Sequence, residues 1–176
     1  MSRTRAPLGA LSADSVGGIR LDARAPCPCR AGSRAGFRAG MRAGPSRGTA
    51  RHPNCYGDCC APLHQGGAAP TAEALMRSRY SAFVLEDRDY LFASWHPTTR
   101  PERIDFDPDK RWLGLTVRAV VAGGDSDDLG TVEFVARYRI KGRATRLHEL
   151  SEFVRAEGRW VYVRGHPAPA RRAGRG

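Results

Sequence analysis

The sequence predicts an α+β fold in which helices pack on one face of a curved antiparallel sheet. One helical periodicity precedes all the strand periodicities, so the helices form one block and the strands another. Short turns join the strands, and each strand has one apolar face, as a sheet with one solvent-facing side requires. Paired cysteines upstream of the helices add a metal site to this prediction.

The helical block begins at Thr71, which is a suitable N-cap. After it, apolar residues recur at spacings of one, three and four and predict an amphipathic helix over residues 72–85. Asp87 can cap a second, shorter helix, which Pro97 ends. The polar stretch 98–110 contains two prolines and predicts a loop.

From Leu113 onward the apolar period changes to two. Leu113, Leu115 and Val121 belong to one predicted apolar face, and a glycine-containing turn follows. The alternation then repeats in a second strand, and two more strands complete a meander. The predicted strands are residues 113–121, 132–140, 145–155 and 159–164.

Low-complexity segments flank the predicted domain. Residues 1–26 are rich in Arg, Ala, Gly and Pro, and with the tail 167–176 they are predicted to be disordered. Residues 30–44 repeat an Arg-Ala-Gly unit, and a glycine at every fourth position disfavours a helix by about 1 kcal/mol each. We therefore interpret residues 30–54 as a low-complexity insertion.

The net charge of +11 is concentrated at the two ends of the chain. Residues 1–54 contain ten Arg and two Asp, whereas residues 55–170 contain sixteen basic and sixteen acidic residues. A balanced domain does not present a basic recognition face, so we do not expect the folded part to bind nucleic acid. RNA contact through the Arg-rich arm is a weaker alternative.

The chain contains no apolar stretch of membrane-spanning length, and its N-terminus lacks the apolar core of a secretion signal. We therefore expect a cytoplasmic protein with no membrane partner. In a reducing compartment, five cysteines favour metal ligands or free thiols over disulfides.

Two close cysteine pairs predict a zinc site. Cys27 and Cys29 flank a single proline, and Cys59 is followed directly by Cys60. Four thiolates around Zn²⁺ form a closed, structural site with no open position for catalysis. The site would carry a charge of −2, which Arg30 can offset.

Two other residues are candidate ligands. Cys55 is a fifth cysteine close to the second pair, and His64 can replace one thiolate. Free thiols without a metal are the alternative interpretation. Farther along, Arg77 and Arg79 are expected on a solvated helix face, with contact to an anion or a partner as the alternative.

Several motifs together resemble the bacterial YchJ-like family with its SEC-C zinc motif. They are Cys-Pro-Cys at 27–29, Cys-Cys-Ala-Pro-Leu-His at 59–64, the stretch from Thr71 to Phe83, Ser-Trp-His-Pro-Thr-Thr-Arg-Pro at 94–101, Gly130 to Tyr138, and Leu-His-Glu at 147–149. The resemblance implies a zinc knuckle over residues 27–60 and a cone-shaped domain similar to nuclear transport factor 2 (NTF2) over 61–166. It implies no biochemical role, because the family is largely uncharacterised.

One departure from the family is the long separation between the cysteine pairs, residues 30–58. Each doubling of a flexible loop costs only about 0.6 kcal/mol of closure entropy. Zinc binding at such sites contributes about 10 kcal/mol or more. We therefore expect the site to survive the insertion. A sequencing frame error over residues 30–54 is the alternative.

A cone-shaped fold has a pocket inside its curved sheet, which is the default place for a ligand. Asp89, His96 and one of His148 or Glu149 are candidates for an acid/base set there. His148 and Glu149 are adjacent on a strand and point to opposite faces, so only one can enter the pocket. The alternative is that all four have structural roles.

These observations predict a cytosolic zinc-binding accessory protein that binds a protein partner or a small ligand. A hydrolase or isomerase acting in the cone pocket is the alternative function.

Overall fold

The computed structural model describes residues 18–31 and 55–168. The predictions of disorder for residues 1–17 and 169–176, and of a low-complexity insertion over 32–54, fall outside the described residues. Within the described ranges, no helix is long and apolar enough to cross a membrane.

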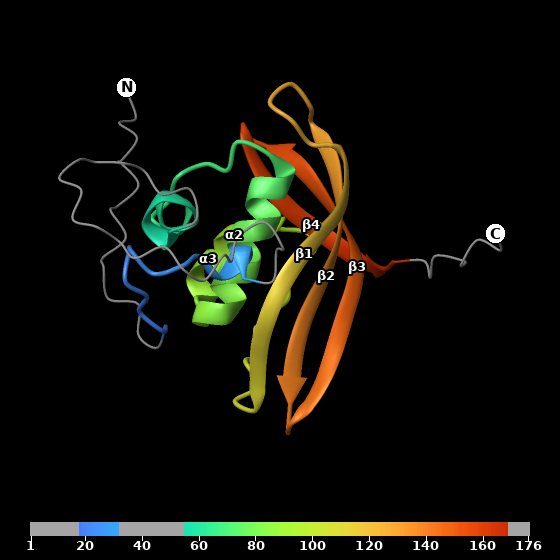
Figure 1. Ribbon diagram of the computed structural model, residues 1–176. Helices are drawn as coiled ribbons and strands as arrows, with labels where there is room; N and C mark the ends of the chain where they lie inside the picture. Colours follow the sequence, from blue (N-terminus) through green and yellow to red (C-terminus); the bar gives the residue numbers. More distant parts are fainter. Residues whose placement is uncertain (1–17, 32–54, 169–176) are drawn as a thin grey trace, which may run out of the picture.

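A four-stranded antiparallel sheet forms one layer of the fold. Its strands are β1 (Lys110–Ala122), β2 (Leu129–Ile140), β3 (Arg143–Ala156) and β4 (Arg159–Pro167). They pair in the order β1-β2-β3-β4, and each pair is antiparallel. The sheet is curved, and the helices lie on one side of it (Figure 1). The predicted α+β meander is confirmed.

The helical layer precedes the sheet in the chain, as predicted. It contains two 3₁₀ turns and three α-helices: η1 (Pro28–Arg30), η2 (Tyr56–Asp58), α1 (Ala61–His64), α2 (Ala72–Leu85) and α3 (Arg88–Ala93). Thr71 Oγ1 accepts a hydrogen bond from the Ala74 N–H at 3.1 Å, so the predicted N-cap of α2 is confirmed. Helix α3 ends before Ser94, and Pro97 therefore lies beyond its terminus.

The period-two pattern of β1 is broken by two register shifts. Leu115 is fully buried, but Leu113 is 41% and Val121 66% exposed, so the predicted apolar face of this strand is wrong at both ends. The shifts fall between Trp112 and Gly114 and between Val117 and Ala119. A bulge reverses the face of the residues beyond it, which explains why simple alternation fails here.

The core lies between α2 and the sheet. Helix α2 contributes Leu75, Met76 and Tyr80, each at most 5% exposed. The sheet contributes Leu115, Val132, Phe134, Ala136, Phe153 and Trp160. Each large apolar side chain buried in this way stabilises the fold by about 1.5–3 kcal/mol. This packing fixes the position of α2 on the inner face of the sheet.

Part of the N-terminal arm that was predicted to be disordered is bonded to the domain. The Ile19 N–H donates to the Leu85 carbonyl at 2.8 Å, and Pro26 forms an isolated antiparallel bridge with Cys55. Composition predicted disorder because it carries no information about backbone pairing with a distant segment. Residues 18–26 are therefore attached to the folded part.

The β1–β2 turn touches the first residue of α2, and this contact gives a testable prediction. Gly123 has φ +82°, and a Cβ there would lie 2.6 Å from the Ala72 Cβ. Gly142 has a similar φ of +80° but nothing within 4 Å of the same position. We expect Gly123→Ala to lower the free energy of unfolding by about 2–4 kcal/mol, and Gly142→Ala by about 1–2 kcal/mol. Equal denaturant midpoint shifts would contradict the steric argument.

Candidate metal centre

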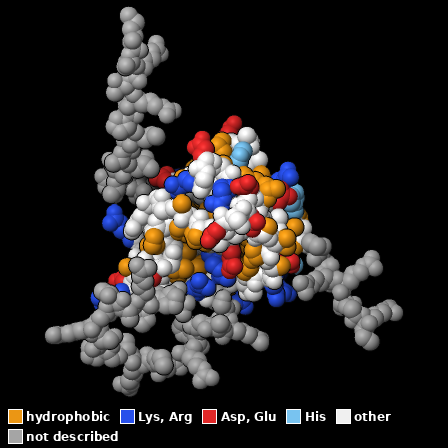
Figure 2. All heavy atoms as spheres, turned by 90° about the horizontal axis from the view of Figure 1, so that it is seen from above, with side chains coloured by type: hydrophobic (Ala, Val, Ile, Leu, Met, Phe, Trp, Pro, Cys, Tyr) orange, Lys and Arg blue, Asp and Glu red, His pale blue; other side chains and the backbone are white. Residues whose placement is uncertain are grey.

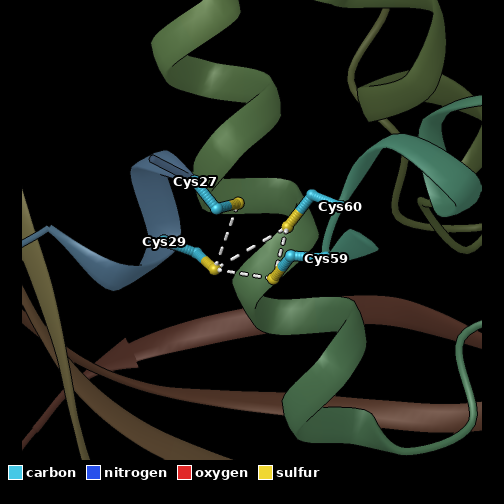
Figure 3. Close-up of side chains that lie close together, drawn as sticks. All are labelled: Cys27, Cys29, Cys59 and Cys60. Carbon is cyan, nitrogen blue, oxygen red and sulfur yellow. Dashed lines mark hydrogen bonds between the residues drawn. The ribbon is translucent and has the colours of Figure 1, made fainter. Parts of the chain in front are cut away.

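Four cysteine side chains meet beside α2. Cys27 directly precedes η1 and Cys29 lies within it, whereas Cys59 directly follows η2 and Cys60 precedes α1. Their Sγ atoms all lie within 4.8 Å of one another. Figure 3 shows the four side chains pointing toward a common centre from these two separate segments. Cys27, Cys29 and Cys60 are at most 1% exposed, so the group is closed to solvent on most sides.

Four of the six sulfur–sulfur separations are close to those of a metal–thiolate tetrahedron, and the other two are within 4.8 Å. Cys29 Sγ lies 3.5 Å from both Cys27 Sγ and Cys59 Sγ and 3.7 Å from Cys60 Sγ. The Cys59–Cys60 separation is 3.8 Å. With Zn–S bonds of about 2.3 Å, a tetrahedral site has sulfurs about 3.8 Å apart. A disulfide needs about 2.05 Å, and all four cysteines are free thiols.

Backbone pairing brings the two cysteine segments together. The Tyr56 N–H donates to the Ala25 carbonyl and the Gly57 N–H to the Ala23 carbonyl, both at 2.8 Å. On the other side of η1, the Leu115 N–H donates to the Ala31 carbonyl at 3.1 Å. These bonds hold η1 between η2 and β1, so the separation of the pairs along the chain does not prevent their meeting.

Close packing at Gly57 leads to a second prediction. A Cβ there would lie 2.9 Å from the Ala23 Cβ and 3.0 Å from the Ala23 carbonyl oxygen. Gly57→Ala must push the two cysteine segments apart, so we expect metal affinity to fall by about tenfold or more. Competition against a chromophoric chelator measures this. Gly124→Ala, whose Cβ would make only an ordinary 3.5 Å contact, is the control, and equal affinities would refute the prediction.

Polar groups surround the cluster and favour its charged form. Ser81 Oγ donates to Cys60 Sγ at 3.4 Å and lies 3.6 Å from Cys27 Sγ. Burial lowers the pKa of Arg30, but a hydrogen bond to Cys59 and the charges of the thiolates outweigh burial and raise it. A permanently charged guanidinium beside the sulfurs offsets part of the negative charge of a metal–thiolate centre.

The thiols share protons when no metal is bound. Hydrogen bonding with the Cys29 thiol lowers the pKa of Cys27 to about 7, and hydrogen bonds from Cys27 and its neighbours lower that of Cys59. The same hydrogen bonds raise the pKa values of Cys29 and Cys60. Cys29 and Cys60 therefore keep their protons at neutral pH, and a cation that binds all four sulfurs must displace them.

The two alternative ligands lie outside the four-sulfur group. His64 Nε2 lies 3.0 Å from the Ser78 carbonyl, which only accepts, so Nε2 carries the proton and Nδ1 accepts from the Tyr56 hydroxyl at 2.9 Å. Burial lowers the pKa of His64 and favours this neutral form. Cys55, whose backbone forms the bridge to Pro26, is absent from the group.

A separate cavity of about 260 Å³ lies between α2 and the sheet. Residues from α2 and from all four strands line it. Its aromatic lining consists of Tyr80, Phe83, Trp95, Trp112, Phe134 and Tyr162. The position agrees with the pocket expected inside the curved sheet.

The structure does not bring the four proposed pocket residues together as an acid/base set. Glu149 lines the cavity and accepts from Ser151 Oγ at 2.7 Å. His148 Nε2 lies 2.7 Å from Glu133 Oε1, and His96 Nδ1 lies 2.8 Å from Thr98 Oγ1. Asp89 lies in α3 and does not line the cavity. His148 and Glu149 are neighbours on a pleated strand, so only Glu149 reaches the cavity, as alternation predicts.

Sequence reasoning missed Arg79, which lines the same cavity. It was expected on a solvated helix face, but it is only 4% exposed, and burial lowers its pKa to about 10. Its spacing offered a signal, because Arg79 follows Leu75 by four residues and Met76 by three. That spacing places it on the apolar face of α2.

The surface of the domain carries both signs of charge. On the face shown in Figure 2, basic and acidic side chains are interspersed among hydrophobic ones. This mixture agrees with the equal numbers of basic and acidic residues over 55–170. Most of the Arg-rich arm lies outside the described residues.

Bacterial proteins of similar sequence match most of this chain. A UPF0225 protein of Bordetella pertussis is 55% identical over 117 residues, which cover 64% of this chain and 86% of that protein. A UPF0225 protein of Chromobacterium violaceum is 45% identical over 146 residues, covering 81% and 93% of the two chains.

Two solved structures of SEC-C motif containing proteins have a similar fold. The protein from Rhodopseudomonas palustris is 36% identical with a TM-score of 0.58, over 66% of this chain and 94% of that one. The protein from Psychrobacter arcticus is 28% identical with a TM-score of 0.60, over 84% and 85%. The family model for the middle NTF2-like domain of YchJ matches residues 71–165. This chain therefore belongs to the YchJ-like family of SEC-C motif proteins.

Proposed function

We propose that this chain is a zinc-containing accessory protein of the cytoplasm. In this proposal its four-cysteine centre is a closed structural zinc site, and its cone-shaped NTF2-like domain binds a small ligand. The observation that carries the first part is the set of four sulfurs, whose recorded separations of 3.5–3.8 Å agree with a zinc–thiolate tetrahedron.

The chemistry of the donors supports zinc and a structural role. Four soft sulfur donors suit zinc, and a tetrahedron of four protein ligands leaves no position for water or substrate. Free thiols of this kind persist in a reducing compartment. The ion would join η1 to the η2–α1 segment and so close the N-terminal edge of the domain.

The cavity supports binding in preference to catalysis. Aromatic side chains form much of its lining, as in many small-ligand sites. General acid/base chemistry needs two titratable groups within reach of one substrate. Of the four candidates for that task, Glu149 alone lines the cavity, and the two histidines bond to groups elsewhere.

Metal analysis and cobalt substitution test the structural zinc site. We expect one zinc per chain after purification in the absence of chelators. Co²⁺ in its place should give the intense visible absorption of tetrahedral thiolate coordination, and added azide should leave that spectrum unchanged. Less than half an equivalent of metal after reconstitution would refute the site. A spectral shift with azide would show an open position and refute its structural role.

A further inference from the structure

Arg79 is a buried cation with no carboxylate in ion-pair contact among the described residues, although the charge of Glu149 acts on it from a greater distance and opposes the lowering of its pKa by burial. Its side chain lines the cavity, and its Nη1 donates to the Leu91 carbonyl at 3.1 Å and to Ser94 Oγ at 2.6 Å. In the described ranges, no carboxylate lies within ion-pair distance of it, and Nε and Nη2 have no recorded acceptor. A buried charge whose donors are incompletely used is costly unless a further partner completes it.

Aromatic rings surround the Arg79 guanidinium. Its central carbon lies 4.7 Å from the Trp95 ring centroid and 4.3 Å from the Tyr162 ring centroid. Ring faces stabilise a cation but accept few hydrogen bonds, so they do not use the N–H edge of the group. The Trp95 Nε1 is also buried with no partner among the residues that the structure describes. The Trp95 N–H is itself inaccessible, so Nε and Nη2 of Arg79 are the donors left for a ligand at this end of the cavity.

A second cation lines the cavity at Lys110. Its Nζ lies 4.2 Å from the Trp112 centroid and 4.3 Å from the Tyr138 centroid. Lys110 also lines a larger neighbouring hollow of about 520 Å³, so it lies between the cavity and that more open space. The recorded ion pairs of the described residues include none for this ammonium.

The carboxylate in the lining is already engaged. Glu149 Oε1 accepts from Ser151, and the Glu149 side chain packs so closely on Gly165 that a Cβ at that glycine would overlap it. The lining therefore carries two cations and one carboxylate, a formal net charge of +1, and among the described residues the carboxylate forms an ion pair with neither cation. Charge complementarity then favours an anion, and the aromatic walls favour an apolar body attached to it.

We propose that this cavity binds a small organic monocarboxylate with an aromatic or aliphatic body, whose carboxylate accepts from Arg79 Nε and Nη2. Lys110 contributes a second positive charge on the side of the larger hollow. The volume of about 260 Å³ limits the ligand to one smaller than a typical drug molecule. This inference rests on the proposed ligand-binding role of the domain and names the class of ligand.

Matched probes on the zinc-loaded full chain test the inference. Phenylacetate and hexanoate carry the charge, and phenylacetamide and hexanamide are their neutral counterparts. Trp95 and Trp112 line the cavity, so binding is followed by tryptophan fluorescence and by calorimetry. We expect at least one carboxylate to bind at least about tenfold more tightly than its amide. Equal affinities would overturn anion recognition but leave a ligand-binding cavity. No binding of any probe at about 10 mM would overturn both.

Two lysine variants locate the anion. The chain has two lysines, so Lys110→Gln and Lys141→Gln remove the same charge at different places. Lys141 is exposed, and its Nζ lies 3.9 Å from Asp109 Oδ2. We expect Lys110→Gln to weaken carboxylate binding at least about threefold and to leave amide binding unchanged, with no effect from Lys141→Gln. Equal effects of the two variants would place the anion outside the cavity and refute the proposal.

Arg79→Met tests the direct contact with similar side-chain length and no charge. If the variant folds, as its circular dichroism and zinc content will show, the preference for carboxylate over amide should disappear. An unchanged preference in the folded variant would exclude Arg79 as the partner. If the variant does not fold, the lysine pair and the matched probes still decide the question.

Discussion

A Cys60→Ser variant is expected to lose tight zinc binding and much of its stability. Cys60 is 1% exposed, and its sulfur lies 3.7–3.8 Å from Cys29 Sγ and Cys59 Sγ. Serine has nearly the same size but supplies no soft thiolate, so the tetrahedron loses one ligand. Structural zinc contributes about 10–16 kcal/mol in small zinc domains. We expect the free energy of unfolding to fall by about 3–5 kcal/mol or more.

Cys55→Ser is the matched control for this variant. Cys55 lies next to η2, but its side chain is outside the four-sulfur group. The control should therefore keep one zinc per chain and an unchanged thermal midpoint. Metal analysis and thermal unfolding of the two variants, each with and without a chelator, give the comparison. Full zinc content in Cys60→Ser, or zinc loss in Cys55→Ser, would contradict the assigned ligand set.

Local features of the fold were predictable from the sequence. Helix α2 has the bounds that periodicity predicted, because Thr71 caps it through its own side chain and the apolar spacing repeats over several turns. The β2 alternation also held, with Val132, Phe134 and Ala136 all buried. Propensity, capping and periodicity depend on neighbours in the chain, so a single sequence contains the information.

Features that depend on distant contacts were not predictable. The bulges of β1 arise from its pairing with β2, and they reverse the exposure expected for Leu113 and Val121. Residues 18–26 are held by backbone bonds to the Cys55–Gly57 stretch and to Leu85. Arg79 was misplaced because an arginine is seldom buried without a carboxylate. Rings of Trp95 and Tyr162, far apart in sequence, replace that partner.

The candidate metal site was named from chemistry and resemblance, and the structure brings those four cysteines together. The sequence left Cys55 open as a further candidate ligand, and only the folded arrangement places it outside the four-sulfur group. The pocket residues show the same limit. The alternation of side chains along a strand predicted that His148 and Glu149 point to opposite faces. The partner of His148, Glu133, is known only from the pairing of β2 with β3.

The second large effect is a steep loss of zinc affinity on acidification. Zinc binds thiolates, so each proton held by the metal-free cluster must leave when the ion binds. The raised pKa values of Cys29 and Cys60, which follow from their hydrogen bonds to neighbouring thiols, keep two protons in place at neutral pH and above. Cys27 has a pKa of about 7, so it adds a third proton below that pH. Hydrogen bonds from the neighbouring thiols lower the pKa of Cys59 and so favour its thiolate form.

The sign and the size of the pH dependence follow from this proton count. Each displaced proton weakens zinc binding about tenfold for every unit by which the pH falls. The dissociation constant should therefore rise at least about 100-fold from pH 8 to pH 7, and more steeply below pH 7, where Cys27 also takes up a proton. Chelator competition measures the constant, and calorimetry in buffers of different ionisation enthalpy counts the released protons. The Cys55→Ser control should show the same slope. An affinity that stays constant between pH 6 and pH 8 would mean that zinc displaces no protons, and would contradict binding by a cluster in which Cys29 and Cys60 are protonated.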